Sequence, residues 1–154
     1  MTGQIPACPS SKVAQSSGDR LVIGVDIGST TVKTVAIGRG SRSIRWQQYQ
    51  RHETRQAATV LAQLEALAAA LGEEAIADAR IFITGSGAAP LIEPLGAKFF
   101  QEVNAVTIAV ETLHPEAGSV IELGGQDAKI IVFKETTATG EKRAITSMND
   151  KCAS

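Results

Sequence analysis

Two short segments of this sequence combine an acidic residue, a glycine turn and a lysine in the same order. Residues 25–36 (VDIGSTTVKTVA) align without a gap with residues 121–132 (IELGGQDAKIIV), 96 positions further along the chain. In each copy an apolar stretch ends in a carboxylate, turns at glycine and returns past a lysine into a second apolar stretch. A repeat at a fixed offset reflects architecture, so the two copies predict a pair of related hairpins.

The residue types in these hairpins suit a polyphosphate and its magnesium ion. Glycine lets backbone N–H groups approach phosphate oxygens in unusual conformations, and the turns supply Gly28, Gly124 and Gly125. Hydroxyl donors follow the first of these glycines, at Ser29, Thr30 and Thr31. Carboxylates at strand ends can hold Mg²⁺ through its waters, which predicts magnesium ligands at Asp26 and Glu122. Lys33 is a candidate cation for balancing phosphate charge, and the two hairpins together predict a nucleotide clamp.

The second turn also supplies Gln126 and Asp127, either of which is a candidate for orienting the water that attacks a phosphate. Each piece also has a simpler interpretation. A single acid–x–glycine turn is most often only a hairpin, and a strand lysine such as Lys33 or Lys129 most often lies on a solvated face. The prediction therefore depends on the matched pair of hairpins.

Two other nucleotide-binding motifs are missing from the sequence. No G-x-x-x-x-G-K-[ST] loop is present, and residues 85–90 (GSGAAP) break a G-x-G-x-x-G pattern at its last position.

Hydrophobic periodicity predicts the elements that position the hairpins. Besides the second hairpin, strands are predicted at residues 21–26, 32–37, 43–51, 81–83, 98–101 and 143–146. Apolar residues at helical spacing predict helices at residues 55–71, 90–95 and 103–113, and Gly72 is a stop signal for the first. This order predicts an α/β fold, a mixed sheet with helices in two related halves. The turn at residues 85–87 is open to interpretation as a hinge or as a plain turn.

The predicted halves divide the chain unequally. Residues 1–20 read as a flexible N-terminal tail, residues 21–117 as a first subdomain, and residues 118–154 as the incomplete start of a second. Three strands without covering elements would leave an apolar face and sheet edges exposed. We therefore expect the 154 residues to be a fragment or truncation of a longer protein.

Composition narrows the functional class. The net charge of −1 gives no basic field for nucleic acid, and no apolar run approaches the roughly 20 residues that span a bilayer. Two cysteines, Cys8 and Cys152, make no disulfide framework, so a reducing cytoplasm is expected. The histidines, His52 and His114, are predicted to be a surface strand residue and a helix end, without catalytic roles.

The two turn motifs resemble those of a known superfamily. Residues 26–31 (DIGSTT) look like the first phosphate motif of the acetate kinase, sugar kinase, Hsp70 and actin superfamily, and residues 122–127 (ELGGQD) look like its second. Within it, residues 124–129 (GGQDAK) followed by residues 148–153 (MNDKCA) are similar to the activator ATPases of 2-hydroxyacyl-CoA dehydratases and benzoyl-CoA reductases. Residues 83–87 and 101–105 also look like that family, nearer its large multidomain members. The resemblance implies a ribonuclease H-like, actin-like ATPase fold.

The resemblance also implies a function. Such activators are homodimers that hydrolyse ATP with Mg²⁺ and deliver low-potential electrons to a partner dehydratase or reductase. They carry one [4Fe–4S] cluster at the subunit interface, held by two cysteines from each chain. Cys152 matches the first cluster cysteine, and the second would lie beyond Ser154. Cys8 has no match.

Some features depart from the family pattern. Small activators usually carry Asp where Glu122 stands, and the adenosine-binding and second hinge motifs are absent. We therefore expect these residues alone to bind nucleotide weakly and to show little or no turnover. Two alternatives are a small-metabolite kinase of the same superfamily and a truncated, non-catalytic binding module. The N-D-K-C segment at residues 149–152 argues against the kinase.

Overall fold

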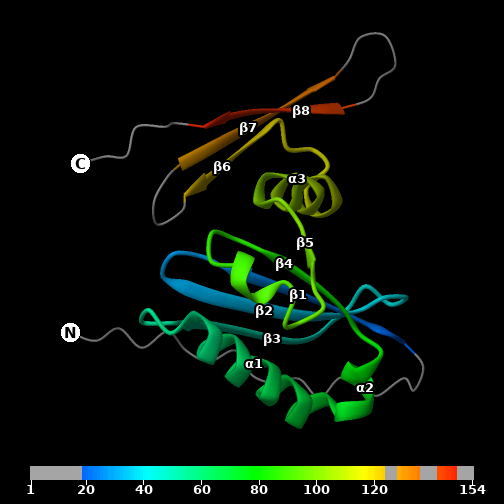
Figure 1. Ribbon diagram of the computed structural model, residues 1–154. Coiled ribbons are helices and arrows are strands. Elements are labelled where there is room, and N and C mark those ends of the chain that lie inside the picture. Colours follow the sequence, from blue (N-terminus) through cyan, green and yellow to red (C-terminus); the bar gives the residue numbers. More distant parts are fainter. Residues whose placement is uncertain (1–18, 124–127, 136–141, 149–154) are drawn as a thin grey trace, which may run out of the picture.

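The chain folds into two β-sheets and three α-helices in a computed structural model that describes residues 19–123, 128–135 and 142–148 (Figure 1). The first sheet contains β1 (Leu21–Ile27), β2 (Thr31–Gly38), β3 (Ile44–Arg51), β4 (Arg80–Thr84) and β5 (Lys98–Phe99). The second sheet contains β6 (Ser119–Leu123), β7 (Ala128–Glu135) and β8 (Lys142–Met148). The helices are α1 (Gln56–Leu71), α2 (Glu73–Ala77) and α3 (Glu102–Leu113), with a 3₁₀ turn, η1 (Ala89–Leu91).

The first sheet is mixed, as the sequence predicts. Its strand order is β3-β2-β1-β4-β5, in which β1, β2 and β3 pair antiparallel while β4 runs parallel to both β1 and β5. The second sheet is an antiparallel meander in the order β6-β7-β8. The segments predicted as two related hairpins therefore form β1–β2 in one sheet and β6–β7 in the other.

The main hydrophobic core lies between the first sheet and α1. Alternate residues of β1 are buried, because a strand presents every second side chain to the same face. The helix covers that face with Val60, Gln63 and Leu67. Gln63 is fully buried, and its side chain accepts a hydrogen bond from the Thr34 hydroxyl (2.6 Å) and donates one to the Val32 carbonyl (3.3 Å). These bonds satisfy the buried amide and fix α1 against β2.

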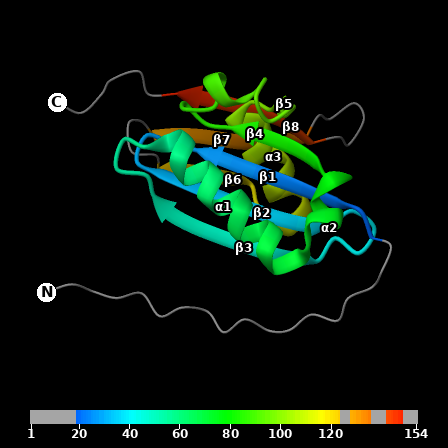
Figure 2. The same cartoon turned by 60° about the horizontal axis from the view of Figure 1, so that its bottom comes forward.

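Helix α3 lies on the opposite side of the first sheet from α1. Figure 1 shows it between the two sheets, and the turned view in Figure 2 agrees, with α1 in front of the sheet and α3 behind it. Lys129, Ile131 and Phe133 of β7 are buried. Asp26 and Lys33 lie on the face of the first sheet opposite the buried residues of β1, so this face points toward α3 and away from the main core.

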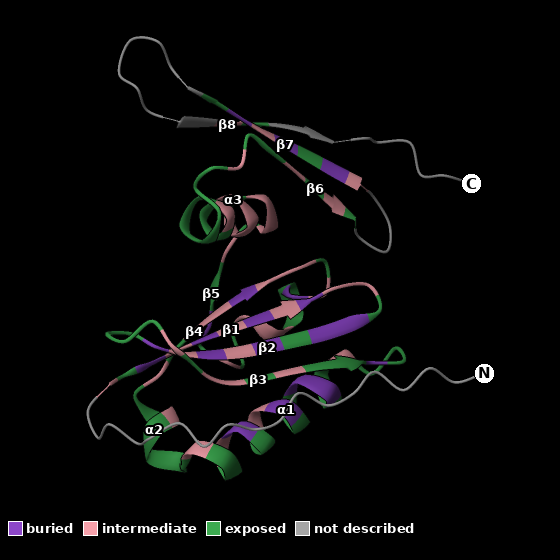
Figure 3. Ribbon diagram, turned by 180° about the vertical axis from the view of Figure 1, so that it is seen from behind, coloured by how far each residue is buried: buried purple, intermediate pink, exposed green. Residues whose placement is uncertain are grey.

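The other face of the second sheet is apolar and exposed, as the sequence predicts. Figure 3 shows exposed and buried residues alternating along β7. The large apolar side chains exposed there are Ile121, Leu123, Ile130 and Ile145. Leu123 is 80% exposed, whereas Ile131 of the neighbouring strand, on the face that turns toward α3, is 1% exposed. Such a surface is far less polar than the solvated face of an ordinary antiparallel sheet.

Two local elements differ from the sequence-based expectation. The helix predicted at residues 90–95 is only the 3₁₀ turn η1, because Pro94 has no N–H with which to bond the carbonyl four residues earlier. The short helix α2 was not predicted. It starts directly after Gly72, whose φ of 92° ends α1, and Glu73 and Glu74 occupy its first turn, where acidic side chains are favourable.

Within the described residues, no helix is long and apolar enough to cross a membrane.

Candidate functional site

The first hairpin pairs its acid directly with its lysine. Asp26 and Lys33 are cross-strand partners in the β1–β2 ladder, and Lys33 Nζ lies 2.7 Å from Asp26 Oδ2. Because paired residues in an antiparallel ladder share one face, both side chains project from the sheet face opposite α1. The adjoining position of β4 is Thr84, which is in register with Asp26.

One oxygen of Asp26 is buried without a partner. Asp26 Oδ1 and the Thr84 hydroxyl have no hydrogen-bond partner among the described residues. An unsatisfied carboxylate oxygen costs free energy unless a cation or a donor meets it. Gly85 leaves the space beside it open, since a Cβ at that position would lie 2.8 Å from Asp26 Oδ1. The geometry therefore keeps a free acceptor at the end of β1.

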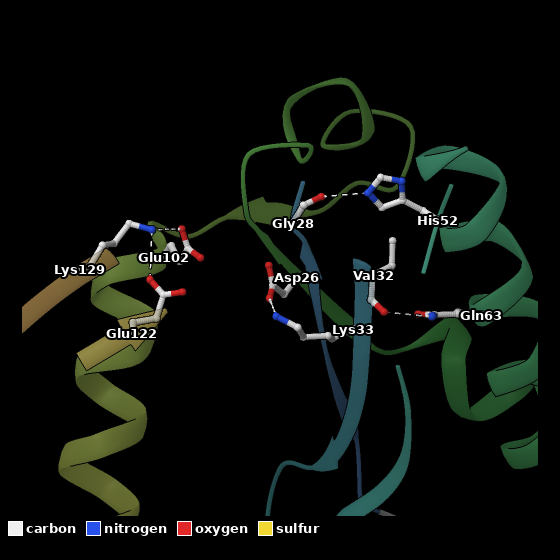
Figure 4. A network of polar contacts seen from close by, with 9 residues as sticks. All are labelled: Asp26, Gly28, Val32, Lys33, His52, Gln63, Glu102, Glu122 and Lys129. Atoms are coloured by element: carbon white, nitrogen blue, oxygen red, sulfur yellow. Dashed lines mark hydrogen bonds and ion pairs between the residues drawn. The ribbon is translucent and has the colours of Figure 1, made fainter. Parts of the chain in front are cut away.

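The second hairpin repeats the arrangement with one additional acid. Glu122 and Lys129 are cross-strand partners in the β6–β7 ladder, and Lys129 Nζ lies 3.2 Å from Glu122 Oε2. Lys129 Nζ also donates to Glu102 Oε2 at 2.9 Å. Glu102 is the first residue of α3, so the ammonium ties that helix to the second sheet (Figure 4). The side chain of Lys129 is only 11% exposed.

Both lysines are held in their charged form. The hydrogen bond to Asp26 raises the pKa of Lys33 above its usual value, and more distant acids, including Glu102, add to this shift. Burial alone would lower the pKa of Lys129, but the hydrogen bonds to Glu102 and Glu122 outweigh it and raise the pKa.

The turn between β1 and β2 is short and tied from two sides. Gly28 N–H donates to the Thr31 carbonyl at 2.9 Å, which closes the turn on itself. His52 N–H donates to the Thr30 carbonyl at 3.2 Å, and the imidazole Nε2 of the same residue lies 3.2 Å from the Gly28 carbonyl oxygen (Figure 4). The loop that the sequence predicts to bind phosphate is thus fixed by residues that follow β3.

The structure describes some of the predicted site residues and not others. Around the turn, Ser29 is half-buried, Thr30 is exposed and Thr31 is buried. Gly28 has no positive φ. The positive φ beside the site belongs to Gly85 instead, at 95°. The remaining predicted residues lie outside the described part of the chain: Gly124, Gly125, Gln126, Asp127 and Cys152.

Two expectations are corrected by the structure. His52 was expected to be a surface strand residue, but it follows β3 and is 4% exposed, because its ring packs against the turn and bonds the Gly28 carbonyl. Lys129 was expected to lie most often on a solvated face, but two carboxylates hold it in a buried position.

Sequence reasoning gave no role in the site to three residues that shape it: Gly85, Glu102 and His52. Gly85 had a signal, the glycine pair at residues 85–87 directly after a strand. Glu102 had a weaker one, an acid in the first turn of a predicted helix. The role of His52 depends on a contact 24 positions away along the chain, which no local pattern reveals.

Gly85→Ala is expected to destabilise the protein by about 2 kcal/mol, because φ there is 95° and a Cβ would strike the Ile27 carbonyl at the end of β1. Gly72→Ala is the matched control, since Gly72 has a similar φ of 92° but nothing within 4 Å of the added Cβ. Thermal or denaturant unfolding measures the stability of both variants. The difference between them gives the cost of the clash with the Ile27 carbonyl, because the backbone strain is similar at the two positions. Equal destabilisation of the two variants would contradict the close approach of Gly85 to β1.

The described residues contain no ready-made group of side chains that could enclose a metal ion. Outside residues 124–127, 136–141 and the two ends, no three His, Cys, Asp or Glu side chains gather closely enough to hold a metal ion. Magnesium does not need such a cage, because it usually takes one or two carboxylates and completes its shell with waters and substrate phosphates. The unpartnered Oδ1 of Asp26 fits that requirement.

The fold is similar to several solved structures. The activator of the 2-hydroxyisocaproyl-CoA dehydratase from Clostridium difficile, solved with bound ADPNP, matches with a TM-score of 0.66 and 29% identity over 86% of this chain and 47% of that one. Component A of the (R)-2-hydroxyglutaryl-CoA dehydratase from Acidaminococcus fermentans matches with a TM-score of 0.67 and 26% identity, over 87% and 49% of the two chains. This chain thus spans about half the length of either structure.

More distant structures share the fold alone. The ethanolamine utilization protein EutJ from Carboxydothermus hydrogenoformans matches with a TM-score of 0.57 at 13% identity, over 89% of this chain and 55% of that one. No protein-family model and no curated protein matches the sequence. The chain therefore has the actin-like ATPase fold, and it is structurally similar to the activators of 2-hydroxyacyl-CoA dehydratases, the family that its motifs predict.

Proposed function

We propose that this chain is the ATP-binding part of an ATP-hydrolysing activator of an acyl-CoA dehydratase or reductase. The observation that carries the proposal is the repeated, in-register pair of acid and lysine beside a glycine turn, Asp26 with Lys33 and Glu122 with Lys129. The nucleotide analogue bound by the activator of similar fold from Clostridium difficile supports a nucleotide as the ligand. Residues 21–117 and the residues from 118 onward are proposed to form the two subdomains that flank it.

Each hairpin residue has a distinct role in this proposal. Asp26 and Glu122 hold Mg²⁺, which neutralises phosphate charge when it is bound. Lys33 is half exposed and carries its charge on the same face as Asp26, so it can move from the carboxylate to a phosphate oxygen. The backbone N–H groups of residues 29–31, and of Gly124 and Gly125, donate to the phosphates. Catalysis is then a matter of position and electrostatics.

Glu122 must leave part of its present contact to act in this way. Its Oε2 accepts a hydrogen bond from Lys129, and Lys129 keeps a second acceptor in Glu102 at 2.9 Å. The ammonium can therefore stay paired with Glu102 while Glu122 turns to the cation. Gln126 or Asp127, in the second turn, is proposed to orient the attacking water.

The finer part of the proposal concerns electron transfer. We propose that the natural protein is a homodimer whose subunits share a [4Fe–4S] cluster through Cys152 and a further cysteine, and that a dehydratase or reductase accepts the electron. The support is the sequence of residues 148–153 and the fold shared with two dehydratase activators. The natural full-length protein, prepared without oxygen, is expected to contain iron and to give the EPR signal of a [4Fe–4S] cluster after reduction. Iron-free protein with full ATPase activity would exclude this part alone.

The ATPase proposal is tested with Gln126→Ala in the natural full-length protein. The wild type is expected to bind and hydrolyse Mg·ATP, and the variant is expected to hydrolyse it about a hundredfold more slowly with nearly unchanged affinity. Calorimetric titration with Mg·ADPNP gives the affinity, and phosphate release gives the rate. Equal loss of both would refute the role of Gln126, and a wild type that binds no Mg·ATP would refute the proposed function.

A further inference from the structure

A buried histidine contacts the proposed phosphate loop from outside the two repeated hairpins. His52 follows β3 and is 4% exposed, and its ring Nε2 lies 3.2 Å from the Gly28 carbonyl oxygen. Figure 4 shows the imidazole and this carbonyl directed at each other across the end of β1. The main chain of the same residue makes a second contact, since His52 N–H donates to the Thr30 carbonyl at 3.2 Å. One residue therefore holds the loop at two carbonyls.

The hydrogen bonds define which nitrogen carries the proton. Thr54 N–H donates to His52 Nδ1 at 3.1 Å, so Nδ1 is an acceptor and has no hydrogen. The Gly28 carbonyl can only accept, so Nε2 must be the protonated nitrogen and the donor. The ring is thus the neutral Nε2–H tautomer, and its two nitrogens have different tasks. Nδ1 binds the local turn, and Nε2 binds the loop.

The turn that carries His52 is strained. Glu53 and Thr54 both have positive φ, 47° and 67°, a conformation that residues with a Cβ rarely adopt. The bond from Thr54 N–H to Nδ1 and the bond from Arg55 N–H to the His52 carbonyl (2.7 Å) hold the chain in this conformation. Backbone strain of this kind persists where the surrounding structure imposes it, and it recurs at ligand-binding sites. Here the strained turn delivers the imidazole to the Gly28 carbonyl.

We propose that His52 is a positioning residue for nucleotide binding, which acts through the Gly28 carbonyl. Anchoring this carbonyl away from the ligand fixes the peptide planes that follow it, so that the N–H groups of residues 29–31 can face a phosphate. Preorganised donors bind an anion more tightly, because they are already ordered before the anion binds and lose little conformational entropy on binding. The inference rests on the proposed ATP site, but it assigns a residue that lies outside both phosphate motifs and touches neither the nucleotide nor the cation.

Two substitutions separate the tasks of the ring nitrogens. His52→Gln places an amide donor near the position of Nε2, and His52→Asn places an amide oxygen acceptor near the position of Nδ1. In the natural full-length protein, His52→Asn is expected to raise the dissociation constant for Mg·ADPNP about fivefold, and His52→Gln to stay within about twofold of the wild type. Without nucleotide, the amides of residues 28–31 are expected to exchange about fivefold faster in His52→Asn, but not in His52→Gln.

The exchange measurement keeps this inference separate from the proposed function. A wild type that binds no Mg·ADPNP defeats the proposed function, while a loop that exchanges faster only in His52→Asn still supports the anchoring by Nε2. Similar exchange at residues 28–31 in both variants and the wild type overturns the inference. If His52→Asn does not fold, His52→Gln decides alone, because faster loop exchange in that variant would overturn the role of the Nε2 donor.

Discussion

Asp26→Asn is expected to slow magnesium-dependent ATP hydrolysis by the natural full-length protein about a hundredfold. The amide keeps the size of the side chain but removes the negative charge from the oxygen that is buried without a partner. Stability should change by less than about 1 kcal/mol, because the substitution weakens only a partly exposed ion pair with Lys33, whose side chain is 51% exposed. Phosphate release and thermal unfolding, measured on the same preparation, give the two quantities.

Asp78→Asn is the control for this experiment. Asp78 also forms an ion pair, with Arg20 at 3.8 Å, but both side chains are well exposed and precede β4 and β1, at the opposite ends of these strands from Asp26 and Thr84. Its substitution should leave hydrolysis unchanged. The role assigned to Asp26 fails if Asp26→Asn retains wild-type hydrolysis, or if both variants lose activity to the same degree.

Lys129→Met is expected to destabilise the protein by about 2 kcal/mol at neutral pH. The lysine is buried between two carboxylates, at 2.9 Å and 3.2 Å, and its removal leaves Glu102 and Glu122 facing each other without a cation. Breaking a buried ion pair by deleting one partner costs several kcal/mol. The partial exposure of both carboxylates reduces that cost here. Denaturant unfolding at pH 7 measures it.

The pH dependence of the same variant is a second signature. In the wild type the raised pKa of Lys129 stabilises the fold fully below the unfolded-state value of about 10.4, and this contribution is lost as the pH rises through the folded-state value. The variant lacks this term. The stability difference between the wild type and Lys129→Met should therefore shrink as the pH rises above about 10.4, where the wild type begins to lose this contribution.

Lys134→Met supplies the control, because Lys134 lies on the same strand but its side chain is exposed. It should change stability by less than about 0.5 kcal/mol. The double variant Lys129→Met with Glu122→Gln should recover part of the loss, since one of the two charges is gone. A destabilisation of Lys129→Met that is independent of pH and unaffected by Glu122→Gln would show that packing, rather than charge, is responsible.

The sequence predicted most of the architecture, because strong periodic patterns determine it. The strands β1 and β2, the helix α1 and the repeated hairpin all follow from apolar spacing and from the offset repeat. The errors occurred where a single backbone feature outweighed the pattern. Pro94 limited the helix predicted at residues 90–95 to η1, and acidic residues directly after Gly72 started α2.

The candidate site was predicted only in part. Its acidic residues belong to local sequence motifs, whereas other residues of the site lie far from their contact partners along the chain. Asp26 and Glu122 stand at strand ends that the repeat identifies. Glu102 reaches Lys129 across 27 positions, and His52 reaches Gly28 across 24, so each contact depends on how the elements pack. Sequence spacing carries no signal for such pairs.

The direct opposition of acid and lysine in both ladders also bears on how the hairpins assemble. Asp26 faces Lys33, and Glu122 faces Lys129, across adjacent strands. If either ladder slipped by one residue, the lysine would turn to the opposite face of the sheet and lose its carboxylate. The charges that surround the proposed ligand therefore also select the correct strand alignment while the chain folds.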